Sequence, residues 1–140
     1  MDKNRRLGVA AVTAALAVGG ALSVAVPALR QEVLPPEYLG RWYFIGSGGG
    51  ITGEGFGGEA GASIVITRDN EIEHYAPDGT YVSTESFRLT RGTSIYTGEE
   101  AWMLDESSGV PRVVELRPPD GLSISENVYD GFSSWYERGR

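Results

Sequence analysis

His74 is the only histidine in the 140-residue chain, so chemistry that needs an imidazole has to use it. No Gly-x-Ser-x-Gly motif is present, and the chain has no cysteine, which excludes thiolate metal sites and a cysteine nucleophile. Glu71 and Glu73 flank the histidine, but neighbours on a strand point to the opposite face, so a histidine–carboxylate metal site is poorly supported. A half-buried structural histidine is favoured, and a hydrolase or isomerase that uses His74 is the weaker alternative.

Two pairs of adjacent acids are the other candidates for chemistry, Glu99–Glu100 and Asp105–Glu106. Adjacent side chains on a strand diverge, so neither pair converges on one glycosidic bond. Residues 105–109 offer oxygen ligands but lack the spacing of a calcium loop. The sequence therefore predicts a protein that is not an enzyme, with no metal site and no cofactor.

A glycine-rich stretch, residues 46–61, contains nine glycines in sixteen positions. It includes Gly-x-Gly-x-x-Gly spacings, but a dinucleotide site needs a helix directly after the glycines, and a β-type run follows instead. It has no lysine, so it is not a P-loop. A mobile lid over the mouth of a barrel and a plain connection are the two remaining interpretations.

Acidic residues outnumber basic residues, and the formal charge is −7. This balance argues against nucleic acid as a partner, since phosphate neutralisation needs lysine and arginine. Residues 1–29 carry one acid and three bases, so the remainder has eighteen acids, nine arginines and a net charge of −9. We interpret this charge as a source of solubility outside the cell.

The first 29 residues have the pattern of a targeting segment. Lys3, Arg5 and Arg6 precede an uncharged run over residues 7–29, and Ser23–Ala25 and Val26–Ala28 are candidate cleavage sites. The run is also long enough to span a bilayer. A cleaved signal peptide and a retained inner-membrane anchor are both possible, and a buried soluble helix is the third reading. The first two place the mature domain, residues 30–140, in the periplasm or outside the cell.

Short alternating runs dominate residues 30–140, and turn signals separate them. The pattern predicts eight antiparallel strands, at residues 40–45, 63–68, 71–76, 83–91, 95–104, 112–117, 121–125 and 132–138. Shared parity places Ile64 with Ile66, and Leu122 with Ile124, on a buried face. His74 shares the parity of Ile72. An eight-stranded up-and-down barrel would hide this face and remove the free edges, and a two-sheet sandwich is the main rival.

All fourteen aromatic residues lie between residues 38 and 136. They either pack the core or line an apolar cup for a lipid or another small hydrophobic molecule. Tyr75, Tyr96 and Trp102 are the candidates for ligand contacts.

Gly40-Arg41-Trp42 opens the first strand, and Arg138 lies on the last one, in the ending Asp130-Gly131-Phe132-Ser-Ser-Trp135-Tyr136-Glu-Arg138. In an eight-stranded meander this combination resembles the lipocalin/calycin superfamily, in particular small bacterial lipocalin-like proteins. The resemblance covers roughly residues 38–138. It implies that Gly40, Trp42 and Arg138 are fold residues, with the arginine stacked on the indole to close one barrel end. The chain departs from the pattern in having no disulfide, no helix after the last strand and no Thr-Asp-Tyr motif.

The sequence and this resemblance together predict an exported lipocalin-like β-barrel that binds a small apolar ligand, such as a cell-envelope lipid. The alternative is a filled barrel that serves as a non-catalytic interaction or structural module of the cell envelope. Neither hypothesis fixes the oligomeric state, and the membrane enters only through the N-terminal segment if it is retained.

Overall fold

The computed structural model describes residues 32–49, 59–106 and 109–139. All of them belong to one unit of the chain, Glu32–Arg140. The expected signal peptide or anchor lies outside the described residues, as do the middle of the glycine-rich stretch and part of the acidic segment 105–109. Within the described part of the chain, no helix is long and apolar enough to cross a membrane.

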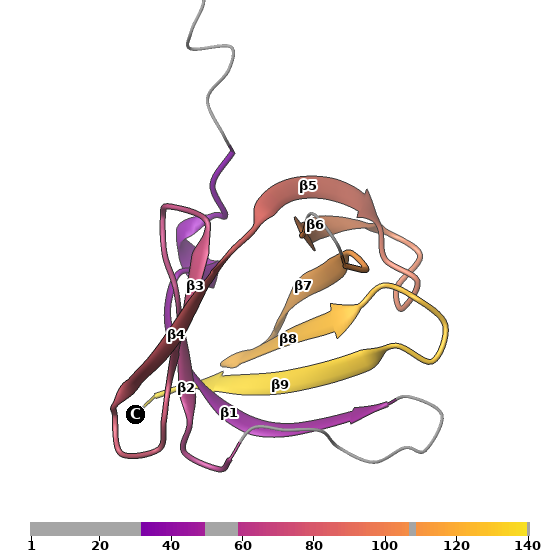
Figure 1. The fold of residues 1–140 in the computed structure, drawn as a ribbon. Helices are drawn as coiled ribbons and strands as arrows, with labels where there is room; N and C mark the ends of the chain where they lie inside the picture. The colour runs from indigo at the N-terminus through magenta and orange to yellow at the C-terminus, as the bar shows by residue number, and fades with distance from the viewer. Residues whose placement is uncertain (1–31, 50–58, 107–108, 140) are drawn as a thin grey trace, which may run out of the picture. The chain divides into compact units, whose positions relative to one another are not determined.

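A 3₁₀ turn, η2 (Pro36–Tyr38), leads into nine strands that form one antiparallel sheet. The strands are β1 (Gly40–Gly49), β2 (Ser63–Ile66), β3 (Glu71–Tyr75), β4 (Tyr81–Ser86), β5 (Arg88–Thr93), β6 (Glu100–Asp105), β7 (Arg112–Arg117), β8 (Gly121–Glu126) and β9 (Phe132–Arg138). Their order across the sheet is β4-β3-β2-β1-β9-β8-β7-β6-β5. Figure 1 shows this sheet curled into a half-barrel. The predicted all-β, antiparallel, up-and-down class is confirmed.

The prediction of eight strands is wrong by one, because the strand expected at residues 83–91 is broken. Phe87 is the one residue between β4 and β5. Its amide donates to the carbonyl oxygen of Asn70 at 2.9 Å instead of to a neighbouring strand, and its ring is buried in the core. β4 pairs with β3, while β5 pairs with β6. The two halves of the expected strand therefore lie at opposite edges of the sheet.

Apart from this break, three strand boundaries differ from the expectation by more than one residue. Residues 95–99 form a turn and not the start of β6, with the Ser94 amide bonded to the Glu99 carbonyl and Gly98 at φ +74°. β2 ends at Ile66 and not at residue 68, because residues 68–70 form the turn to β3. β1 runs on to Gly49, so the first glycines of the expected loop 46–61 lie in a strand, which β1 owes to its pairing with β9.

Glycine makes this extension possible. The Trp135 indole on β9 lies against Gly46 and Gly48, where a Cβ would stand 3.8 and 3.2 Å from the ring. At Gly49, φ is +108°, and an added Cβ would collide with the carbonyl oxygen of Gly131. Gly49 is therefore needed for the close approach of β1 to β9, Gly48 leaves little room for a side chain, and Gly46 has ordinary contact distance.

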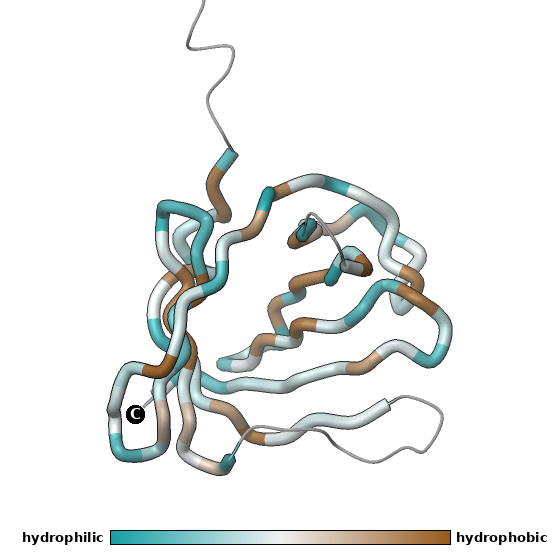
Figure 2. Tube along the Cα trace, in the orientation of Figure 1, coloured by the Kyte–Doolittle hydropathy of each residue, from teal (hydrophilic) through white to brown (hydrophobic). Residues whose placement is uncertain are grey.

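The predicted burial pattern is confirmed on the strands that were correctly placed. Ile64, Ile66, Leu122 and Ile124 are all buried in one core cluster, together with Trp42. Figure 2 shows the corresponding alternation of hydrophobic and hydrophilic segments along β7 and β8. The lead-in adds to this core, since Leu34 is 2% exposed and Tyr38 and Leu39 pack against the cluster.

Candidate functional site

Trp42, which is buried in the core, and Arg138 face each other where β1 pairs with β9. The guanidinium carbon of Arg138 lies 3.7 Å from the centre of the Trp42 ring, and the indole Nε1 donates to the Tyr38 carbonyl at 2.9 Å. Arg138 also donates to the carbonyl oxygens of Glu37 and Arg41, at 2.7 and 3.3 Å. A Cβ at Gly40, where φ is +96°, would stand 3.2 Å from the guanidinium. These contacts join η2, β1 and β9.

A cavity of about 340 Å³ adjoins this core on the inner face of the sheet. Its apolar lining includes three core isoleucines, Ile64, Ile72 and Ile124, and the ring of Phe132. Its polar lining comes from five strands and the β6–β7 connection: His74, Glu85, Glu106, Arg112, Glu126, Ser134 and Tyr136. The cavity thus offers a hydrocarbon surface beside a cluster of ionisable groups, which differs from the purely apolar cup that the aromatics suggested.

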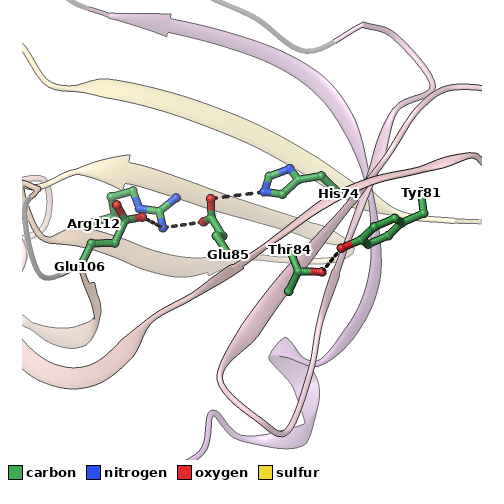
Figure 3. Close-up of polar contacts among 6 residues, drawn as sticks. All are labelled: His74, Tyr81, Thr84, Glu85, Glu106 and Arg112. Carbon is green, nitrogen blue, oxygen red and sulfur yellow. Dashed lines mark hydrogen bonds and ion pairs between the residues drawn. The ribbon is translucent and has the colours of Figure 1, made fainter.

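Glu85 and Arg112 form the centre of that cluster (Figure 3). An Arg112 guanidinium nitrogen lies 2.6 Å from Glu85 Oε1 and 2.6 Å from Glu106 Oε1. On its other side, Glu85 Oε2 lies 3.3 Å from His74 Nε2. Glu85 therefore bridges the histidine and the arginine, and the arginine bridges two carboxylates.

The curl of the sheet brings these residues together. Glu85 lies on the edge strand β4, and Arg112 opens β7, which is far from β4 in the strand order. His74 lies on β3, next to β4. The Arg112–Glu85 pair is consequently a contact across the concave face and not between neighbouring strands. Such a contact requires curvature that the local sequence does not specify.

Electrostatic surroundings shift the pKa values of two cavity groups. The hydrogen bond with His74 and the nearby Arg112 charge lower the pKa of Glu85 to about 2, against the opposing effect of burial. Burial raises the pKa of the Tyr136 phenol, and a hydrogen bond with Ser134 partly opposes this shift. Near neutral pH the cavity therefore contains an ionised Glu85 and a neutral Tyr136.

The three residues expected to contact a ligand lie apart from one another, and none lines the cavity of 340 Å³. Tyr75 borders a recess of about 80 Å³ with His74 and Tyr136, and the Arg41 guanidinium lies 4.4 Å from its ring centre. Trp102 borders a recess of about 290 Å³, and the Arg91 guanidinium lies 4.3 Å from its ring centre. The hydroxyl of Tyr96 donates to the Glu126 carbonyl at 2.6 Å. A ligand role for these residues stays a prediction.

The charged cavity residues were not expected from the sequence, although part of the signal was there. Arg112 shares the parity of the buried Val114, and Glu85 shares that of the buried Phe87. A charged residue at an inward parity needs a partner or a cavity, because an isolated buried charge is costly. What the sequence could not show is that Glu85 and Arg112 meet.

Only one member of each adjacent acidic pair, Glu100 and Asp105, lies in β6. Glu100 pairs with Arg91 at 2.8 Å, and Asp105 pairs with Arg88 at 2.6 Å, while Glu106 turns to Arg112. Across residues 32–49, 59–106 and 109–139, no group of three or more histidine and acidic side chains is arranged to hold a metal ion.

No protein-family model, curated protein or solved structure matches the chain. Its function therefore has to be inferred from the curled sheet, the cavity and the side chains that line it.

Proposed function

We propose that residues 32–140 form a lipocalin-like module that binds a small molecule in the cavity on the concave face. The cavity carries this proposal: about 340 Å³ of space lies between three core isoleucines and the His74–Glu85–Arg112 cluster. Ligand sites combine an apolar surface with a few placed polar groups, and this volume falls in their lower range. Binding would come from burial of the apolar part of the ligand, with the polar cluster fixing its orientation.

Two features support the finer fold assignment. The edge strands β4 and β5 are consecutive in the chain, so the chain itself continues from one edge of the sheet to the other through Phe87. The Trp42–Arg138 contact joins the first strand to the last. Both are compatible with a lipocalin-type barrel in which one strand is sharply bent. We further propose export, on the strength of the basic start and the uncharged run over residues 7–29.

Titration of the protein isolated from its own cells with the neutral apolar dye N-phenylnaphthylamine tests the binding function. We expect saturable dye fluorescence that an excess of a competing apolar molecule reverses. Val110 lines the cavity and is 40% exposed, whereas Val128 is 38% exposed in the β8–β9 turn and does not line it. Val110→Trp should abolish dye uptake by filling the cavity, and the matched Val128→Trp should leave it unchanged.

Dye uptake that does not saturate, or an equal response of the two variants, would contradict the proposal. The filled-barrel interaction module would then be the better hypothesis. A native mass spectrum of the same sample adds a second readout, because a bound ligand appears as a stoichiometric adduct. The mass also shows whether a segment of about residues 1–28 has been removed.

A further inference from the structure

The charges in the cavity restrict the kind of molecule that it accepts. Three carboxylates, Glu85, Glu106 and Glu126, line it together with one arginine, Arg112. Even with His74 protonated, negative charges exceed positive ones, and with His74 neutral the excess is two. The surrounding domain adds to this field, since residues 30–140 carry a net charge of −9. The electrostatic potential of the cavity therefore favours a cation.

The hydrogen bonds that the cavity carboxylates make also favour a cationic ligand. Both Glu85 oxygens are engaged, by Arg112 and His74. Glu106 uses Oε1 for Arg112, and Glu126 uses Oε1 for the Phe132 amide at 2.9 Å. Within the described residues, the second oxygen of Glu106 and that of Glu126 accept no hydrogen bond. The cavity thus presents two acceptor oxygens to an incoming donor.

The cavity disfavours an anionic ligand, because its one arginine is already paired. Arg112 already contacts two carboxylates at 2.6 Å each. Both contacts use the same Arg112 nitrogen, Nη2, so a fatty-acid carboxylate could approach only another nitrogen of the group and would then lie beside both glutamates. Like charges at such a distance are unfavourable. A free metal cation fits no better, because no described group of side chains is arranged to hold one.

We infer that the cavity selects a small amphipathic organic cation, an ammonium group attached to a hydrocarbon chain. The ammonium group pairs with Glu106 and Glu126, and the hydrocarbon lies on the isoleucines. The inference rests on the proposed ligand-binding function, because it assigns the chemical class of the molecule bound in the same cavity.

Competition against bound N-phenylnaphthylamine by three molecules of equal chain length tests this inference: octylammonium, octanol and octanoate. We expect octylammonium to displace the dye at a concentration at least about tenfold lower than octanoate, with octanol between them. Added salt should weaken displacement by octylammonium and leave octanol unaffected, because screening acts on the charged pair.

Isosteric variants test whether Glu106 and Glu126 are the carboxylates that bind the ammonium group. Glu106→Gln and Glu126→Gln should each weaken the binding of octylammonium about fivefold, as expected for one partly exposed ion pair, and leave the binding of octanol unchanged. Glu106→Gln should also strengthen the binding of octanoate, since Arg112 then keeps only one carboxylate partner. Glu99→Gln makes the same charge change outside the cavity, on the exposed turn before β6, and should alter none of the three affinities.

The outcomes separate the two proposals. Equal or better displacement by octanoate would overturn the cation inference while dye binding itself stands. An equal effect of Glu99→Gln and Glu106→Gln would also overturn it, since the preference would then come from the net charge of the domain. If the dye binds without saturation and no competitor displaces it, the ligand-binding function fails as well. Unchanged octanol affinity shows in each variant that the cavity is intact.

Discussion

Glu85 is the residue on which the polar cluster depends, because it is the acceptor for both His74 and Arg112. Its pKa of about 2 lies below the ordinary value of 4.5. The unfolded chain therefore takes up the proton first as the pH falls. The stability that Glu85 contributes is complete above about pH 4.5 and is lost as the pH falls towards about 2.

Glu85→Gln should consequently lower the free energy of unfolding near neutral pH. We expect a loss of about 1–2 kcal/mol, reduced from the full linkage value because the side chain is 33% exposed. The difference between variant and parent should shrink as the pH falls to about 3 and below. Urea unfolding midpoints near neutral pH and at about pH 3 measure the loss of stability and its dependence on pH, with Glu99→Gln as the control. A difference that does not depend on pH would contradict the assignment.

Trp42 and Arg138 support the fold through a different kind of contact, an indole face under a guanidinium at 3.7 Å. Trp42→Ala should cost about 3–5 kcal/mol, as the loss of a fully buried aromatic side chain does. Arg138→Ala should cost about 2 kcal/mol, since it removes the cation–π contact and the donor for two backbone carbonyls. Urea unfolding followed by far-UV circular dichroism measures both losses.

The matched control for the second variant is Arg68→Ala, which removes an exposed arginine after β2 and should change stability by less than about 0.5 kcal/mol. Arg138→Lys should recover little of the stability that Arg138→Ala loses, because an ammonium group does not reproduce a planar stack with several fixed donors. If Trp42→Ala and Arg138→Ala unfold at the same urea concentration as the parent, this contact does not stabilise the sheet.

At the scale of the element, the break at Phe87 separates β4, at one edge of the sheet, from β5, at the other edge. The Phe87 amide bonds to Asn70, which has a positive φ of 56° and donates through its side chain to the Glu32 carbonyl. The β2–β3 turn and the lead-in segment therefore hold the point where β4 ends and β5 begins. The ring of Phe87 joins the core at this corner.

Phe87→Ala should therefore cost about 3–4 kcal/mol, because it removes a buried ring at the corner of the sheet. Val82 lies on β4 with 62% of its surface exposed, so Val82→Ala should change the free energy of unfolding by less than about 0.5 kcal/mol. Urea unfolding compares the two. Equal losses would mean that the corner contributes no more than any edge position.

The elements that were predicted correctly share a physical basis. β7 and β9 have the expected bounds, and β3 and β8 differ by one residue, because period-two alternation and flanking turn residues are local properties. Two of the errors occur where a distant segment intervenes. Phe87 breaks a continuous alternating run in order to bond to Asn70, and β9 extends β1 into its glycines.

At the scale of the whole molecule, the described chain joins a hydrophobic core that includes Trp42 to a partly charged cavity. The lead-in belongs to the core, because Leu34 packs in it and the carbonyls of η2 accept from Trp42 and Arg138. The cavity lies beyond the isoleucines, where the inward positions of β3 and β7 change from aliphatic to ionisable residues and β4 contributes Glu85.

The sequence by itself determined the all-β class, the antiparallel order of neighbouring strands and the buried parity of most strands, since each depends on residues a few positions apart. Only the tertiary structure decided that Glu85 meets Arg112, that His74 has a carboxylate partner on the next strand, and that space remains between them. The longer of these contacts joins residues 27 positions apart across a curved surface. Their existence depends on the curl and register of the entire sheet, which no local pattern encodes.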